Sequence, residues 1–79
     1  MRTATYRSHK IELASERNAS GEWVARATII LEDGQTVRRI PVFGRRRTTF
    51  DTRRRADAYA LELAKIWIDG RLWGANGNG

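Results

Sequence analysis

The chain of 79 residues contains no cysteine, one histidine and one proline. Without cysteine it forms no disulfide, so we expect folding that does not depend on the redox state of its compartment. One histidine and no cysteine also argue against a structural zinc site. No apolar run approaches the roughly 20 residues that a membrane-spanning helix needs, and the first residues lack the apolar core of a secretion signal. We therefore expect a cytoplasmic protein with no cofactor and no membrane partner.

The chain also lacks a recognisable catalytic arrangement. His9 lies in an alternating segment, where a packed or half-exposed histidine is more usual than a general base. Four carboxylates lie on or beside one expected helix, namely Asp51, Asp57, Glu62 and Asp69. Their separations along the helix do not bring them to one metal ion or one glycosidic bond. Gly44 stands alone, so there is no glycine-rich phosphate loop. The sequence predicts a protein that is not an enzyme.

Arginine is what the chain has in excess, and it is concentrated in one segment. Eight of the fifteen basic residues lie between positions 38 and 55, where Asp51 is the only acidic residue. That segment has a net charge of +7, whereas the remaining seven basic and eight acidic residues sum to −1. A concentrated positive field attracts polyanions, most often nucleic acids. The candidate nucleic-acid-binding residues are Arg38, Arg39, Arg45, Arg46, Arg47, Arg53, Arg54 and Arg55.

Alternating apolar and polar residues predict two strands in the first part of the chain. Residues 6–14 alternate around Ile11 and Leu13, whereas residues 1–5 are expected to be frayed. Residues 23–31 alternate over a longer stretch, and their odd-numbered side chains are apolar. Because successive side chains of a strand point to opposite faces, we expect the odd-numbered ones to face the core.

A hairpin and a third strand follow. Asp33-Gly34 is a strong hairpin signal, because both central residues of a type I′ turn need positive φ. In the register that this loop sets, Ile29 lies opposite Arg38, which fits a core face poorly. Pro41 has no N–H to donate, so the third strand is expected at an edge of the sheet or leaving it. The core-facing residues of the third strand would be Ile40 and Val42.

One helix is predicted after the arginine-rich loop. It starts at a cap formed by Asp51 or Thr52 and runs to about Asp69, with Gly70 as its C′ residue. Apolar residues at three- and four-residue steps form one stripe along it, namely Ala56, Tyr59, Ala60, Leu63, Ile66 and Trp67. A second line lies beside the stripe and indicates either a dimer contact or a broad buried face: Leu61, Ala64 and Ile68.

The order strand, strand, strand, helix indicates an α+β fold. We expect a three-stranded antiparallel meander (β-β-β-α) with the C-terminal helix packed on one sheet face. The predicted domain spans residues 1–73, and residues 74–79 are expected to form a flexible tail. Trp23 and Trp67 are expected in the core, whereas Trp73 either seals the core edge or anchors a partner.

Three arginines occupy the expected first turn of the helix, at positions 53–55. Cations are unfavourable at a helix N-terminus by roughly 0.3–1 kcal/mol each, because that end already carries partial positive charge. A bound anion reverses the effect, since it accepts the free N–H groups and pairs with guanidinium groups. Phosphate oxygens are the expected anion, and such contacts carry little sequence specificity. The alternative is a solvated surface without a ligand.

Residues 40–56 resemble the short N-terminal domain of HicB-type antitoxins. The similarity is carried by IPVFG and TTFDTRRRA, a strand, a loop with proline and glycine, and an Asp-Thr helix start. The matching positions are Pro41, Gly44, Asp51, Thr52 and Ala56. The resemblance implies a degenerate RNase H-like half-fold.

The same resemblance implies a second function. Under it the chain would be a protein-interaction module, homodimeric or bound to a toxin-like partner, with no direct role on nucleic acid. The chain departs from the family pattern at Phe50 and Arg55, and it is basic where antitoxin domains tend to be acidic. The sequence therefore leaves two hypotheses open: a non-enzymatic nucleic-acid-binding module, DNA or RNA, and an antitoxin-like interaction module.

Overall fold

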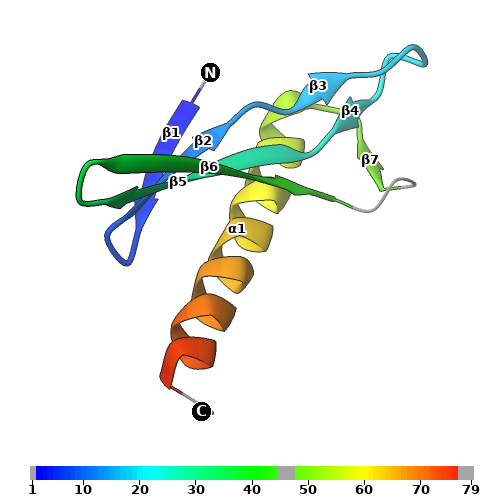
Figure 1. Ribbon diagram of the computed structural model, residues 1–79. Coiled ribbons are helices and arrows are strands. Elements are labelled where there is room, and N and C mark those ends of the chain that lie inside the picture. Colours follow the sequence, from blue (N-terminus) through cyan, green and yellow to red (C-terminus); the bar gives the residue numbers. More distant parts are fainter. Residues whose placement is uncertain (1, 45–47, 77–79) are drawn as a thin grey trace.

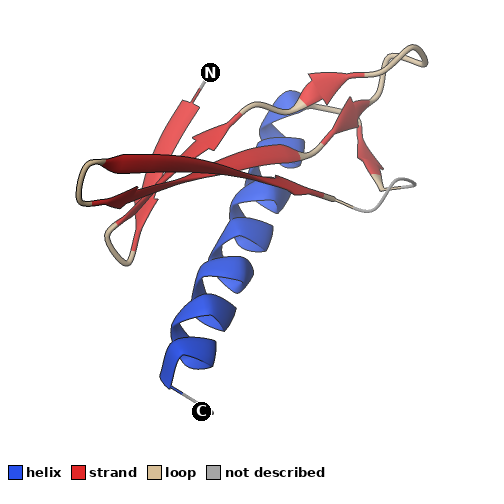
Figure 2. Ribbon diagram, in the orientation of Figure 1, coloured by secondary structure: helices blue, strands red, loops and turns tan. Residues whose placement is uncertain are grey.

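The computed structural model describes residues 2–44 and 48–76, with only the backbone described for residues 74–76. Within these residues the chain forms two antiparallel sheets and one C-terminal helix (Figures 1 and 2). The larger sheet has the order β1-β2-β5-β6 and consists of β1 (Arg2–Tyr6), β2 (His9–Leu13), β5 (Arg26–Asp33) and β6 (Thr36–Phe43). The smaller has the order β3-β4-β7 and consists of β3 (Glu16–Arg17), β4 (Trp23–Val24) and β7 (Thr49–Phe50). Helix α1 (Arg53–Asn76) contacts strands of both sheets.

The prediction of an α+β fold with antiparallel strands and one C-terminal helix is confirmed. The prediction of a three-stranded meander is wrong, because the described chain has seven strands in two sheets. Two causes account for the difference. An edge strand, β1, precedes the first predicted strand. Three short strands, β3, β4 and β7, form a separate sheet.

The additional edge strand is β1. Residues 2–6 pair antiparallel with residues 9–13, so the expectation that residues 2–5 are frayed is wrong. Arg7 and Ser8 form the two-residue loop, with φ of +47° and +66°, and two positive φ values are those of a type I′ turn. Neither residue is the glycine or asparagine that usually marks such a turn. The usual residue pattern of a hairpin loop is therefore missing at this turn.

The β5–β6 hairpin has a different register from the predicted one. Asp33 pairs with Thr36, so the loop is Gly34-Gln35, and of these two residues only Gly34 has positive φ, at +64°. Glycine at the first central position is the pattern of a type II′ turn. The pairing shifts by two residues, which preserves the side-chain faces and places Ile40 rather than Arg38 opposite Ile29. The poor fit of Arg38 to the core thus disappears, and Pro41 lies in edge strand β6, as predicted.

The predicted strand over residues 23–31 is divided at Ala25. Trp23 and Val24 pair with β3 and β7, whereas the chain from Arg26 onward pairs with β2 and β6. The predicted core face survives the division, since the odd-numbered residues from 25 to 31 are all buried. Trp23 is partly buried and packs against the core, as expected.

Helix α1 begins as predicted and ends later. The Thr52 side chain caps it, because its Oγ1 accepts a hydrogen bond of 3.1 Å from the Arg55 amide. The helix continues through Gly70 to Asn76, so the predicted end near Asp69 is wrong. The predicted tail at residues 74–79 stays a prediction, because residues 77–79 lie outside the described part of the chain.

The face that α1 buries also differs from the predicted stripe. Its fully buried apolar residues recur every four positions: Ala56, Ala60, Ala64 and Ile68. Ile66, assigned to the core stripe, is 67% exposed, whereas Leu61 and Trp67 pack against the core. Alanines let the helix approach the sheet closely, where they meet the inward residues of β2 and β5. The result is a thin core whose large, fully buried side chains are few.

Candidate nucleic-acid interface

The described structure does not gather the predicted arginines at one place. Arg45, Arg46 and Arg47 lie outside the described residues. Arg53, Arg54 and Arg55 form the first turn of α1. Arg38 shares a hollow with Arg71, near the other end of the helix. Eighteen residues of helix separate Arg53 from Arg71, about 27 Å at the usual rise per residue. Arg38 and Arg39 therefore belong to a different region from the helix start.

Three arginines line one hollow at the start of α1. Arg53 and Arg54 line a hollow of about 340 Å³ with Arg2 and Asp57. Arg2 is the first residue of β1 and pairs with Leu13 at the end of β2, which brings it to this end of the helix. Arg2 is not among the arginines predicted from the sequence, because residues 1–5 were expected to be frayed. A prediction of the β1–β2 hairpin would have placed Arg2 in an edge strand rather than in a frayed end.

The start of α1 also carries backbone amide donors. The first amides of a helix have no intrahelical acceptor. The Arg55 amide is capped by Thr52 Oγ1, and the Ala56 amide donates to the Thr52 carbonyl oxygen at 3.2 Å. Among the described residues no acceptor lies at the amides of Arg53 and Arg54. These N–H groups and the helix dipole make the hollow favourable for an anion.

Asp57 is the buried polar residue of the hollow, with 1% of its surface exposed. Its Oδ1 accepts a hydrogen bond of 3.3 Å from the Ser15 amide, just beyond β2. The Ser15 hydroxyl in turn accepts from the Arg26 amide at 3.3 Å. These bonds hold the first turns of α1 against the sheet. Asp57 therefore fixes where the arginine-bearing turn lies.

The second oxygen of Asp57 has no hydrogen-bond partner among the described residues. Arg53 Nε lies 3.9 Å from this Oδ2, within ion-pair distance but beyond a hydrogen bond. The Arg53 guanidinium also lies over the Trp23 ring, 6.0 Å from its centroid. These two contacts make Asp57 and Trp23 positioning residues for Arg53.

Arg55 has a different neighbour from Arg53 and Arg54. Its Nη1 lies 3.6 Å from Asp51 Oδ1, and both side chains are more than 70% exposed. Such an exposed ion pair contributes little, about 0–1 kcal/mol. Because consecutive residues of a helix point about 100° apart, one anion does not meet all three arginines of the turn. The site therefore consists of Arg2, Arg53 and Arg54.

The sheet face away from α1 carries charges of both signs. Arg39 forms an ion pair with Glu12 on β2, and Arg26 forms one with Glu16 at 3.0 Å. Arg26 also stacks over the Phe43 ring, 5.2 Å from its centroid. Because these guanidinium groups already have carboxylate partners, we interpret this face as a solvated surface of mixed charge.

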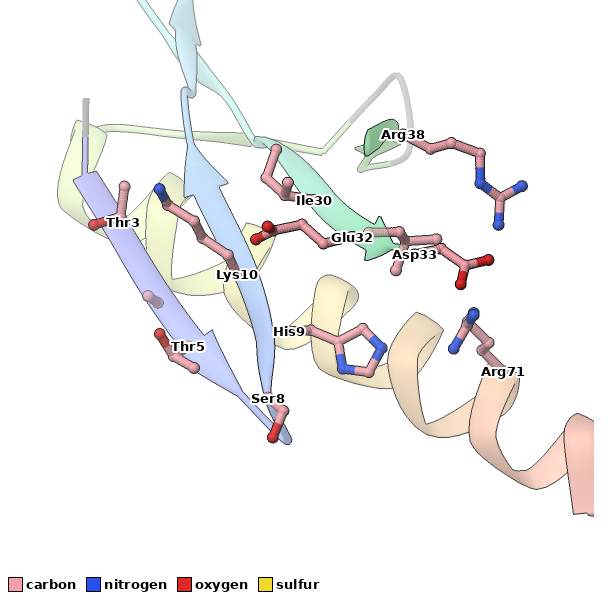
Figure 3. Close-up of a pocket in the computed structure, with 12 residues that line it drawn as sticks. Thr3, Thr5, Ser8, His9, Lys10, Ile30, Glu32, Asp33, Arg38 and Arg71 are labelled. Carbon is pink, nitrogen blue, oxygen red and sulfur yellow. The ribbon is translucent and has the colours of Figure 1, made fainter. Parts of the chain in front are cut away.

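A second hollow of about 500 Å³ lies at the hairpin end of the sheet (Figure 3). Figure 3 shows Arg38, Asp33 and Arg71 on one side of it, with the carboxylate between the two guanidinium groups. His9 also lines it, and its Nδ1 lies 2.7 Å from the Arg7 carbonyl oxygen, so this nitrogen already has a partner. The lining mixes both charge signs and singles out no ligand chemistry.

Two other site types find no support in the described ranges. Residues 2–44 and 48–76 contain no group of three histidine, aspartate or glutamate side chains close enough to hold a metal ion. Within the same ranges, α1 lacks the apolar length that a bilayer crossing demands.

Comparison with known families gives one match. The chain belongs to the family described as a domain of unknown function, DUF6566, whose family model matches residues 1–78. Neither a curated protein nor a solved structure matches the chain. The resemblance to HicB-type antitoxins stays a prediction.

Proposed function

Because the DUF6566 description assigns no activity, we propose from the geometry of α1 that this chain is a non-enzymatic nucleic-acid-binding module. Its phosphate contacts are made at the start of α1, by Arg53 and Arg54 together with Arg2. One observation carries the proposal: Arg2, Arg53 and Arg54 line a single hollow at the positive end of the helix, where the amides of Arg53 and Arg54 have no acceptor among the described residues.

A phosphodiester group fits these donors. One phosphate oxygen can accept the amides of Arg53 and Arg54, while another pairs with a guanidinium group in a charge-assisted contact. The hollow is open and its arginines are exposed, so a polymer can pass across it. The formal charge of +6 draws such a polymer to the chain over longer range. Contacts of this kind position a backbone and read no bases.

The charge of Asp57 does not oppose this binding directly. Its carboxylate is buried and lies beside Arg53, so the exposed rim of the hollow is made of guanidinium groups. Arg45, Arg46 and Arg47 precede the helix in sequence by only a few residues and stay predicted contributors. Arg38 and Arg39 are not part of the proposed site, because they lie on β6, near the other end of the helix.

The test is a salt titration of a fluorescent oligonucleotide, read by anisotropy with single-stranded DNA, double-stranded DNA and RNA. For the double variant Arg53→Gln/Arg54→Gln we expect weaker binding and a shallower dependence of log K on log salt. Each lost phosphate contact reduces the slope by about 0.7–0.9.

The matched control is Arg38→Gln/Arg39→Gln, which removes the same charge from the distant region. If binding needed only the net charge, the two double variants would weaken it equally. That result, or wild-type chain that binds no oligonucleotide at low salt, would overturn the proposed site.

A further inference from the structure

The outer face of α1 carries large apolar side chains that the described residues leave exposed. Ile66 is 67% exposed and Trp73 is 77% exposed. Leu63, one turn before Ile66, is partly exposed, and Gly70 lies between Ile66 and Trp73. We call these four residues the helix seam. Their steps of three, four and three residues are those of one face in a pair of packed helices.

The C-terminal turns of α1, orange to red in Figure 1, extend past the strands. At about 100° per residue, Ile66 and Trp73 lie about 160° and 180° around the helix from the fully buried Ala64, whereas Leu63 lies at the margin of the buried face. Exposed aromatic and aliphatic side chains in register along a helix are typical of an interaction surface.

Gly70 adds a second observation. Glycine inside a helix lowers the equilibrium constant for folding roughly fivefold relative to alanine. A Cβ atom placed on Gly70 would meet nothing within 4 Å, and Gly70 is absent from the residues with positive φ. Neither packing nor backbone conformation within this chain therefore requires glycine here. Its absence of a side chain leaves a gap in the seam between Ile66 and Trp73.

We propose that the helix seam binds the seam of a second copy of this chain, with the two helices antiparallel. In that arrangement Ile66 of each copy lies opposite Gly70 of the other, and Leu63 lies opposite Trp73. Each pair of facing residues then combines a larger residue with a smaller one. The seam is thus complementary to itself, which a two-fold symmetric dimer requires and another partner would not.

The charges of α1 select the antiparallel direction. A parallel pair would place the two arginine-bearing first turns side by side. In the antiparallel pair the two Arg54 residues lie about 40 Å apart along the axis, at about 1.5 Å per residue. That distance is several times the screening length of about 8 Å at physiological ionic strength. The same arrangement leaves the start of both helices free.

Glu62 and Asp69 lie beside the seam, and both are paired within their own chain. Lys65 Nζ lies 3.3 Å from Glu62 Oε2. Arg7 Nε lies 2.9 Å from Asp69 Oδ1, and the Tyr6 hydroxyl donates to Asp69 Oδ2 at 3.0 Å. Hydrogen bonding to the Tyr6 hydroxyl, with the nearby Asp69 charge, raises the pKa of Arg7, so it stays cationic. Two copies therefore do not bring bare carboxylates together.

The length of the seam sets the expected affinity. From Leu63 to Trp73 the contact is about 15 Å long, and stable interfaces bury about 800 Å² on each partner. A single helix contact of that length covers only part of such an area. We therefore expect a dissociation constant on the order of micromolar rather than nanomolar.

Sedimentation equilibrium of the full chain over about 1–500 μM tests the proposal. The wild-type mass should rise with concentration from 9.0 kDa toward twice that value. Ile66→Glu should weaken the association at least tenfold, because it buries a charge in the seam. The control is Val37→Glu, which makes the same change of charge at another exposed apolar residue, 59% exposed on β6. It should leave the dimer unchanged.

Gly70→Ala distinguishes an effect on dimerisation from an effect on folding, because it should stabilise the fold and weaken the dimer. In dilute solution the added methyl should raise the urea midpoint through helix propensity. At high concentration it should weaken dimerisation, because it fills the space that Ile66 of the second copy occupies. Strictly monomeric wild-type chain, equal loss in Ile66→Glu and Val37→Glu, or a tighter dimer in Gly70→Ala would each overturn the proposal. Because it rests on α1 alone, it survives failure of the oligonucleotide experiment.

Discussion

Helix α1 has an inner face that the sheet covers and an outer face that the described chain leaves bare, and two isoleucines show the difference. Ile68 is fully buried, whereas Ile66, two positions earlier, is 67% exposed. The inner face is made mostly of alanine, which brings the helix close to the sheet. Apolar character alone therefore does not identify the inner face. Large side chains on the outer face call for another explanation, and a second copy supplies one.

The same contrast separates the polar residues at the start of α1. Asp57 is buried and bonded to the Ser15 amide, while Asp51 and Arg55 form an exposed pair. Residues on the covered side fix the position of the helix, and those on the open side are available to a ligand. Four substitution experiments test this division.

The largest expected effect compares the two isoleucines. Ile68→Ala should lower the free energy of unfolding by about 2–5 kcal/mol, because it removes a fully buried side chain and leaves a cavity. Ile66→Ala should change it by less than about 0.5 kcal/mol in dilute solution, since exposed positions contribute little. Urea denaturation followed by tryptophan fluorescence measures both. Equal losses would show that the inner and outer faces are assigned wrongly.

The next effect concerns Asp57. Asp57→Ala removes the acceptor of the Ser15 amide and should cost about 1–3 kcal/mol in unfolding free energy. Asp57→Asn keeps an oxygen acceptor and should cost less, while Asp51→Ala at the exposed pair should be nearly neutral. The measurement is again chemical denaturation. A loss in Asp57→Asn as large as in Asp57→Ala would show that the charge beside Arg53, rather than the Ser15 bond, holds the helix.

A smaller effect is expected at the helix cap. Thr52→Ala should destabilise the chain by about 1 kcal/mol, because the Arg55 amide loses its acceptor. Thr52→Ser keeps the hydroxyl and should retain most of the stability. Thermal unfolding by circular dichroism distinguishes the two variants. If both lost stability equally, capping by the hydroxyl would not be the cause.

The smallest effect has the opposite sign and links stability to the proposed function. Arg54→Gln removes a cation from the positive end of the helix and should raise the unfolding free energy by about 0.3–1 kcal/mol at low salt. The gain should shrink as salt is added, and oligonucleotide affinity should fall in the same variant. Stability and binding measured together test it. A variant that lost stability would show that Arg54 serves the fold rather than a ligand.

Much of the fold was visible in the sequence, for reasons that are local. Alternation around Ile29 identified the central strand and its core face. A cap at Asp51 or Thr52, followed by apolar side chains at three- and four-residue steps, predicted the helix and its start. Pro41 indicated an edge strand because proline lacks an N–H. Each of these signals depends on the backbone geometry of only a few neighbouring residues.

The errors share a different origin. The Arg7-Ser8 turn uses residues without turn preference, so β1 and the place of Arg2 were missed. The two-residue shift of the β5–β6 register was missed because both registers keep the same faces. Ile66 was assigned to the core because helical periodicity identifies apolar stripes. It does not show which of two apolar stripes the sheet covers.

By itself the amino-acid sequence determined the α+β class, the helix start, the edge position of Pro41 and the excess of arginine between residues 38 and 55. These depend on side-chain patterning and composition, which are properties of neighbouring residues. Only the tertiary structure decided which arginines line the same hollow and which apolar residues are exposed. Arg2 meets Arg53 and Arg54 through strand pairing, and the sheet covers Ile68 but leaves Ile66 exposed, because contacts between distant segments follow from packing and not from local preference.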